Sequence, residues 1–267
     1  MKIYISADIE GVAGVTAWEE TEAGGRGYEE AAALMTAEVG AACEAAKAAG
    51  ASEILVKDAH DTGRNIDHSQ LPDYVRLYRG WSGHPRIMLE GLDESFGGVI
   101  FLGYHSAAGS GGSPLAHTMN TGLDQVMLNG LLCDELLLHA WLARHLGVRP
   151  LAVTGDRELC DLAAERFPGM TAVAVKEGIG NGTVSLHPEA AIREIKRGIG
   201  EAMGAAAVKE DDRLRLPEDF RLEIRYREQH LAYKNSFYPG CRLQDPRTVV
   251  FETDDYGEIM RCANFIM

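Results

Sequence analysis

Two carboxylates follow the first apolar segment of the chain. The opening residues, MKIYISADIEG, place Asp8 and Glu10 directly after a strand-like run that contains Ile3 and Ile5. Side chains two positions apart on an extended backbone point to the same side, so these carboxylates can converge. A buried strand rarely ends in two acids unless something compensates their charge. The pair therefore predicts a cation site or an acid–base pair, and the alternative is that both acids cap backbone N–H groups.

Polar residues also end three later apolar segments. They are Asp58 and His60 after EILVK, His105 after GVIFLGY, and Asp156 after LAVTG. Ligands of open parallel sheets bind beyond the carboxyl ends of the strands, and adjacent strands lie about 4.8 Å apart. The side chains at these ends can therefore share one crevice. Carboxylate and imidazole donors without a thiolate favour Zn, Mn or Co over Cu(I), Mg or Ca.

Each of these later residues has a second interpretation. Asp58 is expected to orient His60 rather than to bind metal, as acids beside metal-binding histidines commonly do. His105 follows an apolar strand and can be a hydrogen-bonded core histidine. Asp156 precedes a predicted helix, and we favour a helix-capping role for it.

Three residues between 117 and 139 are ambiguous from their local pattern alone. Glu135 stands at a helix start, where the helix dipole favours acids in any case. His139, one turn later, does not complete an HExxH motif and is interpreted as structural. His117 follows a glycine-rich loop, 107–114, that is expected to be mobile and lacks the lysine of a phosphate-binding loop. His117 can reach a site bordered by His105 or can be an ordinary loop residue.

The elements that must position these residues alternate along the chain. Hydrophobic periodicity and turn residues predict strands at 2–9, 53–59, 75–78, 98–105, 151–154 and 171–175, and helices at 28–49, 134–146, 157–167 and 188–204. Such alternation predicts a mostly parallel sheet in a three-layer α/β/α core. A hairpin is expected over 125–132, where Asn129-Gly130 supplies a tight turn.

The domain prediction follows from the charged segment near residue 210. Residues 1–205 are expected to form an α/β catalytic domain that carries the metal site. Residues 206–267 contain the β-rich stretches FRLEIRYRE and TVVFET and a last helix from Asp254. They are expected to form a smaller α+β lobe that serves in oligomerisation or as a pocket wall.

Composition excludes several classes of function. The 267 residues carry a formal charge of −14, which argues against nucleic acid and anionic membrane surfaces as partners. The five cysteines are widely spaced and form no CxxC, so neither a disulfide framework nor a thiolate zinc site is expected. No signal peptide and no apolar run long enough to span a bilayer is evident, and a cytoplasmic location is expected.

The ordered motifs resemble one family. The opening SADIEG is similar to the S-x-D-x-E-G signature of the D-aminopeptidase family of dinuclear zinc peptidases. The similarity continues through KDAHD (57–61), EGLDESFGGVIFLGYH (90–105), AHTM (116–119) and DE (134–135), over roughly residues 1–200. The resemblance implies that Asp8 bridges two zinc ions and that the other ligands are Glu10, His60, His105 and Glu135. His117 matches a position with a catalytic role, described in some accounts as the nucleophile. We favour acid–base or transition-state stabilising work for it, because a metal-activated water is already nucleophilic.

The resemblance also implies an activity and an assembly. We expect an aminopeptidase that releases N-terminal, D-configured residues such as D-Ala from short peptides, with two Zn²⁺ per subunit, or Mn²⁺ or Co²⁺ in their place. A ring-like homo-oligomer, a decamer in the family, is implied as well. The alternative is a dinuclear metal hydrolase, an amidase or phosphoesterase, that acts on another small substrate. A third reading is a non-catalytic α/β protein that binds peptides or nucleotides.

Overall fold

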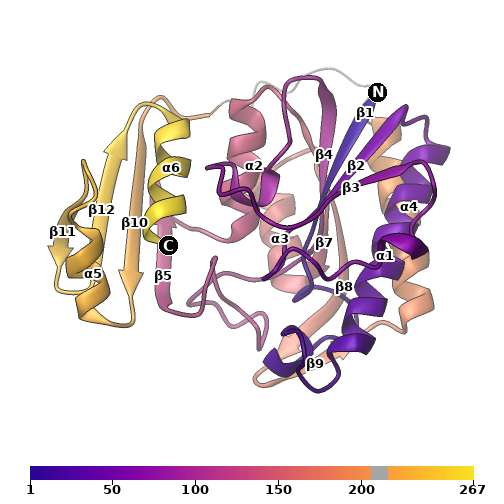
Figure 1. Cartoon of the computed structure of the whole chain (residues 1–267), viewed down its shortest axis with the longest axis horizontal. Coiled ribbons are helices and arrows are strands. Elements are labelled where there is room, and N and C mark those ends of the chain that lie inside the picture. The colour runs from indigo at the N-terminus through magenta and orange to yellow at the C-terminus, as the bar shows by residue number, and fades with distance from the viewer. Residues whose placement is uncertain (206–215) are drawn as a thin grey trace.

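A computed structural model describes residues 1–205 and 216–267, so the predicted connection near residue 210 lies largely outside the described residues. Its centre is a seven-stranded sheet in the order β3-β2-β1-β4-β7-β8-β9 (Figure 1), in which only β9 runs antiparallel to its neighbour. The strands are β1 (Lys2–Ala7), β2 (Glu53–Asp58), β3 (Val75–Tyr78), β4 (Phe96–Tyr104), β7 (Pro150–Asp156), β8 (Thr171–Ile179) and β9 (Gly182–Ser185).

Helices cover both faces of this sheet, which confirms the predicted three-layer core. A hydrophobic core lies on each face of the sheet, and alternate residues of β1 point into one or the other. Ile3 and Ile5 pack with one helix pair, and Tyr4 packs on the opposite face. The first pair is α1 (Tyr28–Ala48) and α4 (Pro188–Ala205), and the second is α2 (Glu135–His145) and α3 (Arg157–Arg166). None of the described helices is long and apolar enough to cross a membrane.

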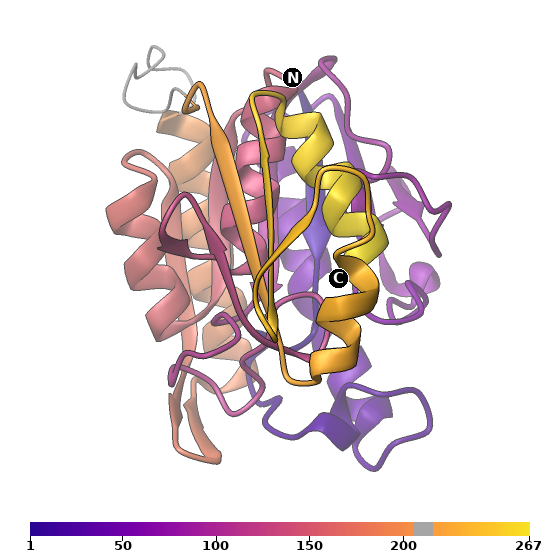
Figure 2. The same ribbon diagram turned by 90° about the vertical axis from the view of Figure 1, so that its left-hand side faces the viewer.

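A second sheet builds a smaller lobe beside the core (Figures 1 and 2). Its antiparallel order is β11-β12-β10-β5-β6. The strands are β5 (Leu123–Leu128), β6 (Leu131–Leu132), β10 (Phe220–Tyr226), β11 (Arg242–Asp245) and β12 (Thr248–Thr253), with α5 (Gln229–Asn235) and α6 (Tyr256–Ile266) against them. The predicted hairpin and the last helix are confirmed, whereas α5 and β11 were not expected.

The hairpin belongs to the second sheet rather than to the first. β5 pairs along its length with β10, so two segments almost a hundred residues apart share one sheet. The lobe is joined to the core through helices as well, because the Tyr256 hydroxyl of α6 donates to the Leu138 carbonyl of α2 at 2.6 Å. The division of the chain at residue 205 into two domains stays a prediction.

Two glycines allow the ends of β1 and β4 to touch. The Gly11 N–H donates to the Gly103 carbonyl at 2.7 Å, and a Cβ at Gly11 would lie 1.9 Å from the Tyr104 carbonyl oxygen. Gly103 has a φ of +69°, which favours glycine. The glycine after Asp8 and Glu10 is therefore required by the close approach of two backbones, and this approach brings the end of β1 against the end of β4.

Candidate metal centre

The polar strand ends meet at one place. Asp8 and Glu10 follow β1, His60 follows β2 and His105 follows β4, and these three strands are neighbours in the order β2-β1-β4. Glu135 is the first residue of α2 and approaches from the adjacent layer. All five side chains are buried. The structure thus brings together every residue that the sequence predicts as a metal ligand.

The two oxygens of Asp8 face different histidines. Oδ1 lies 3.2 Å from His60 Nδ1, and Oδ2 lies 3.6 Å from His105 Nε2. Glu10 Oε2 lies 3.0 Å from His60 Nδ1, and Glu135 Oε2 lies 3.4 Å from His105 Nε2. The contacts around the two histidines therefore define two donor groups, Asp8–Glu10–His60 and Asp8–His105–Glu135, that share the Asp8 carboxylate. Mutual distances within 4.8 Å pick out other sets, Asp8–Glu10–His105 and His105–His117–Glu135, so the pairwise contacts define the two groups used here.

The backbone fixes which ring nitrogen of each histidine faces the acids. His60 Nε2 lies 2.7 Å from the Thr21 carbonyl oxygen, and His105 Nδ1 lies 3.0 Å from the Ser106 carbonyl oxygen. A carbonyl oxygen only accepts, so each of these ring nitrogens must carry the proton. The opposite nitrogen of the neutral ring then presents its lone pair to the carboxylates. Metal-binding histidines are held in this way.

Charge and burial make the buried donors of this cluster compete for protons. Glu10 Oε2 and His105 Nε2 are buried and have no hydrogen-bond partner among the described residues. Burial opposes a charged His105, yet Glu135 beside it raises the histidine pKa to about 10. Burial likewise works against ionised Glu135, but His105 holds the pKa of that carboxyl at about 2. Protons thus compete for the atoms that a cation would take. Nitrogen and carboxylate donors at these positions fit zinc.

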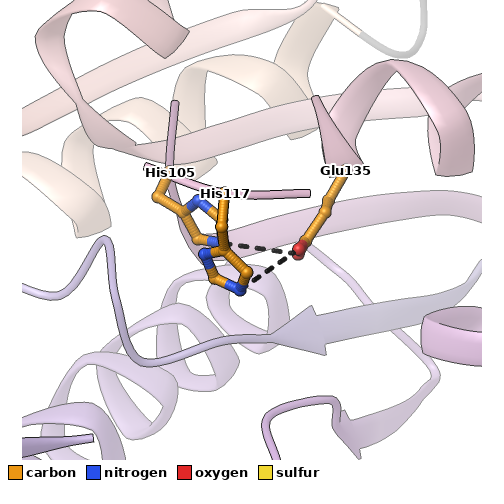
Figure 3. A group of neighbouring side chains, drawn as sticks. All are labelled: His105, His117 and Glu135. Carbon is orange, nitrogen blue, oxygen red and sulfur yellow. Dashed lines mark ion pairs between the residues drawn. The ribbon is translucent and has the colours of Figure 1, made fainter. Parts of the chain in front are cut away.

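His117 lies over the same donors (Figure 3). Its ring stacks on His105 with centroids 4.2 Å apart and planes 7° apart, and its Nε2 is 3.6 Å from Glu135 Oε1. His117 Nδ1 donates to the Leu115 carbonyl at 2.9 Å, so Nε2 is the free nitrogen. Burial, with His105 nearby, lowers the pKa of His117. Ligand-type atoms of His105, His117 and Glu135 all lie within 4.8 Å of one another.

Comparison with known proteins agrees with this geometry. The profile of the M55 peptidase family, described as D-aminopeptidase, matches residues 1–265. The chain belongs to the D-aminopeptidase family. A D-aminopeptidase of Bacillus subtilis (strain 168) is 31% identical over 263 residues, which are 97% of this chain and 93% of the relative. The solved structure of the Zn-dependent D-aminopeptidase DppA from Bacillus subtilis, a self-compartmentalizing protease, superimposes with a TM-score of 0.93 and 29% identity. It covers 100% of this chain and 96% of that one. The family resemblance and the fold class predicted from sequence are confirmed.

Asp58 acts on His60 differently from the sequence prediction. Its carboxylate accepts hydrogen bonds from the Asn65 N–H at 2.6 Å, the Asn65 side chain at 2.8 Å and the Ile66 N–H at 2.8 Å. The Asn65 side chain also donates to the His60 carbonyl at 2.7 Å. In this D-aminopeptidase, Asp58 therefore holds the loop that carries His60, whereas the His60 ring is oriented by Thr21.

Asp134 and Asp156 are helix caps and do not face the metal centre. Asp156 caps α3 by accepting from the Leu159 N–H at 2.9 Å, as predicted, and it also accepts from the Ser106 N–H and hydroxyl at 2.6 Å. Asp134 caps α2. Because Asp134 fills the capping position, the neighbouring Glu135 is free to face the metal centre. His139 is fully buried beneath it and its Nδ1 donates to the Glu135 carbonyl, in keeping with a structural role.

Sequence reasoning missed the residues that fix the loop after β1. Lys176 Nζ donates to the carbonyls of Glu10 and Val15, and Glu38 Oε1 accepts from the Ala13 N–H at 3.0 Å. Lys176 directly follows the apolar run AVAV in β8. The criterion that identified Asp8, namely a charged residue directly after an apolar strand, would also have identified Lys176.

The centre opens into a cavity of about 490 Å³. Asp8, Glu10, His60, His117 and Glu135 form one part of its lining, and Trp18 and Trp81 are also at its surface. No described residue of the 107–114 loop lines this cavity, and Ala107, Ala108 and Ser113 are buried. The expected mobility of this loop stays a prediction.

Proposed function

We propose that this protein is a zinc-dependent D-aminopeptidase that releases N-terminal residues from short peptides. The observation that carries the proposal is the convergence of three buried carboxylates on histidine nitrogens whose lone pairs are fixed by backbone carbonyls. The Bacillus subtilis relative is a D-aminopeptidase, and the solved structure from that organism is of a Zn-dependent D-aminopeptidase.

The proposed ligand sets follow the two donor groups. Asp8 Oδ1, Glu10 and His60 Nδ1 would hold one zinc ion, and Asp8 Oδ2, His105 Nε2 and Glu135 would hold the other. Asp8 would thus be the shared ligand, as the family resemblance implies. Bound zinc would supply a water of lowered pKa and polarise the scissile carbonyl.

His117 is proposed as the catalytic residue. Its Nε2 carries no proton in the tautomer that the Leu115 carbonyl imposes, and His117 is among the residues that line the cavity. His117 therefore accepts a proton from the attacking water at Nε2 and returns it to the leaving amine. The Trp18 ring meets His117 edge-on at 5.1 Å and, with the His105 stack, holds the imidazole in position.

A homo-oligomer is also proposed for this chain. The Bacillus subtilis structure is that of a self-compartmentalizing protease, and a ring-like decamer is what the family resemblance implies. The lobe of this chain exposes Tyr233, Phe237 and Phe265, large apolar side chains of the kind that subunit contacts cover. Light scattering coupled to size-exclusion chromatography measures the subunit number directly.

Metal removal with substrate panels tests the activity. The protein, treated with a chelator and then reloaded with Zn²⁺, Mn²⁺ or Co²⁺, is assayed on D-Ala-D-Ala, L-Ala-L-Ala and a phosphodiester. We expect chelation to abolish cleavage of the D-peptide and Zn²⁺ to restore it. Full activity after metal removal contradicts the metal mechanism. Preferred cleavage of the phosphodiester supports the alternative hydrolase, and preferred cleavage of L-Ala-L-Ala contradicts the stereochemical assignment.

A further inference from the structure

One wall of the cavity is apolar and does not belong to the metal centre. Trp81, Ile87, Met88 and Met119 line the same cavity as the proposed zinc ligands. The Trp81 side chain remains partly exposed, at 39%. A cavity that combines reactive polar groups with an apolar wall can bind the reacting bond at one part and an apolar substituent at another.

Trp81 is fixed both at its edge and on its face. Its Nε1 donates to the Asp61 carbonyl at 2.6 Å, and Asp61 directly follows His60. Lys57 Nζ lies 3.7 Å from the centroid of the indole ring. A cation over an aromatic face is attracted to it, most strongly where water is excluded. The indole therefore has one position relative to His60.

Lys57 owes its own position to a buried partner. The Lys57 and Glu90 side chains are 0% and 1% exposed, with Nζ 3.8 Å from Glu90 Oε2. Lys57 Nζ also donates to the Gly80 carbonyl, the residue before Trp81. Glu90 in turn accepts from the Ser82 N–H and hydroxyl and from the His84 N–H, all within 3.1 Å. The pair thus fixes the segment 80–84 on both sides of the indole.

Backbone strain gathers at the same wall. Ile87 has a φ of +48° and Met119 a φ of +64°. Such values are uncommon outside glycine, and for a β-branched residue they are genuine outliers that persist only where the surroundings impose them. The Met119 N–H donates to Glu135 Oε1 at 2.7 Å, which joins this wall to a proposed zinc ligand. The apolar wall is therefore built to a fixed shape beside the metal centre.

We propose that Trp81, with Ile87 and Met119, is the pocket that selects the substrate by an apolar side chain beside the scissile bond, and that Lys57 is the positioning residue for the indole. This inference rests on the proposed function, since it assigns a specificity pocket to that reaction. The side chain belongs to the first or to the second residue of the peptide, and the two substrate series below distinguish these cases.

The test compares substrate selectivity in four variants. One dipeptide series places D-Leu, D-Ala or Gly before a constant D-Ala, and the other places them after it. Trp81→Ala, Trp81→Phe and Lys57→Met are measured with the zinc-loaded protein. Trp141→Phe is the matched control, because Trp141 packs on Phe220 and Tyr256 and is not among the cavity-lining residues.

We expect the ratio of kcat/KM between leucine and glycine peptides to fall about 10-fold or more in Trp81→Ala, in one of the two series, as loss of apolar contact in a pocket does. Trp81→Phe should lower it less, and Trp141→Phe should leave it at the wild-type value. Lys57→Met should raise KM for the leucine peptide several-fold while kcat and zinc content remain near wild type, which a general loss of structure would not do.

The outcomes separate the two proposals. If the wild-type protein cleaves neither D-peptide series, the proposed function is wrong. If the wild type is active and Trp81→Phe matches Trp141→Phe in both series, the specificity pocket is wrong. The inference is also overturned if Trp81→Ala lowers kcat/KM equally for all peptides, or if Lys57→Met lowers kcat and leaves KM unchanged. Should Trp81→Ala fail to fold, the phenylalanine and methionine variants decide alone.

Discussion

Two groups of buried charged side chains lie at the same edge of the central sheet and differ in how their charge is balanced. In the metal centre, Asp8, Glu10 and Glu135 face histidines whose ring protons are already engaged elsewhere. Near the end of β2, Lys57 is the permanent partner of Glu90, which also accepts hydrogen bonds from the Ser82 N–H, the Ser82 hydroxyl and the His84 N–H. One group is neutralised by residues of the chain itself, while the acids of the other outnumber its fixed positive charges.

This difference in charge balance distinguishes a candidate functional site from a structural ion pair. A buried charge is tolerated when a partner neutralises it, so burial alone does not indicate function. What distinguishes the metal centre is the excess of carboxylate over fixed positive charge, together with unpartnered atoms such as His105 Nε2 among the described residues. The Lys57–Glu90 pair shapes the cavity without taking part in the chemistry. Each prediction below acts on one side of this comparison.

The largest effect is expected from the shared ligand. Asp8→Asn keeps the size of the side chain but removes the charge that both donor groups use. We expect zinc affinity to fall by more than about 100-fold, since even partners outside the coordination shell are worth up to that much. Peptidase activity should fall to background. Metal content by mass spectrometry after dialysis measures the first effect, and Asp67→Asn, at an exposed helix cap, is the matched control.

His117 should separate chemistry from metal binding. His117→Ala removes a proton carrier, and we expect kcat to fall about 10²–10⁴-fold. Zinc content should stay at the wild-type value, because the proposed ligands are untouched. His230→Ala, at an exposed position, is the control. If the variant loses one zinc ion per subunit, His117 is a ligand and its assignment as a proton carrier is wrong.

Breaking the Lys57–Glu90 pair should affect stability rather than metal binding. Glu90→Gln leaves a buried ammonium without its counter-charge, at a cost of about 3 kcal/mol. Burial holds the pKa of Lys57 at about 8, with Glu90 opposing that shift, so loss of Glu90 favours the neutral amine and limits the cost. Thermal unfolding at pH 7 measures the change. The double variant Lys57→Met with Glu90→Gln should be more stable than Glu90→Gln alone, and equal stability would argue against the pairing.

The smallest effect is expected at Glu38, behind the loop after β1. Burial raises the pKa of Glu38 from 4.5 to about 7, with the Ala13 N–H and Lys176 opposing the shift. As the pH rises, the unfolded chain ionises first. The stability that this group contributes is therefore fully present below pH 4.5 and is lost by about pH 7.

Glu38→Gln removes that loss. Ionising the buried Glu38 lowers the free energy of unfolding by about 3 kcal/mol, at 1.36 kcal/mol per pKa unit. We expect Glu38→Gln to raise the free energy of unfolding by about 1–2 kcal/mol at pH 8, less than the full amount because a buried amide still loses water contacts. The gain should vanish near pH 4.5. Thermal midpoints of both proteins across this pH range check the prediction, and a gain that does not depend on pH would contradict it.

Local sequence patterns predict the parts of the site that depend on local structure. Asp8, Glu10, His60 and His105 each follow an apolar strand, and parallel strands end at one edge of a sheet, so their convergence follows from periodicity. Glu135 and His117 have no such signal and were assigned through the family resemblance. The carbonyls of Thr21, Ser106 and Leu115 that set the histidine tautomers are backbone atoms, which no residue type indicates.

Long-range pairing explains what the sequence did not reveal about the fold. Asn129-Gly130 predicts the hairpin at 125–132, but its partner β10 begins at Phe220. Short-range periodicity carries no information about which of two sheets a strand joins. The contact between Trp81 and Lys57 is also long-range and was not predicted. A lysine within a strand is usually exposed, whereas Lys57 is buried under the Trp81 indole.

The sharing of one sheet between distant segments has a consequence for how the molecule is made. All the proposed zinc ligands have been synthesised once the ribosome has passed residue 135, well before β10 is available to pair with β5. The cavity wall is later still, because Asn264 of α6 contributes to it and Tyr256 ties that helix to α2. A growing chain thus possesses its metal residues long before α6, which contributes Asn264 to the cavity lining, has been synthesised.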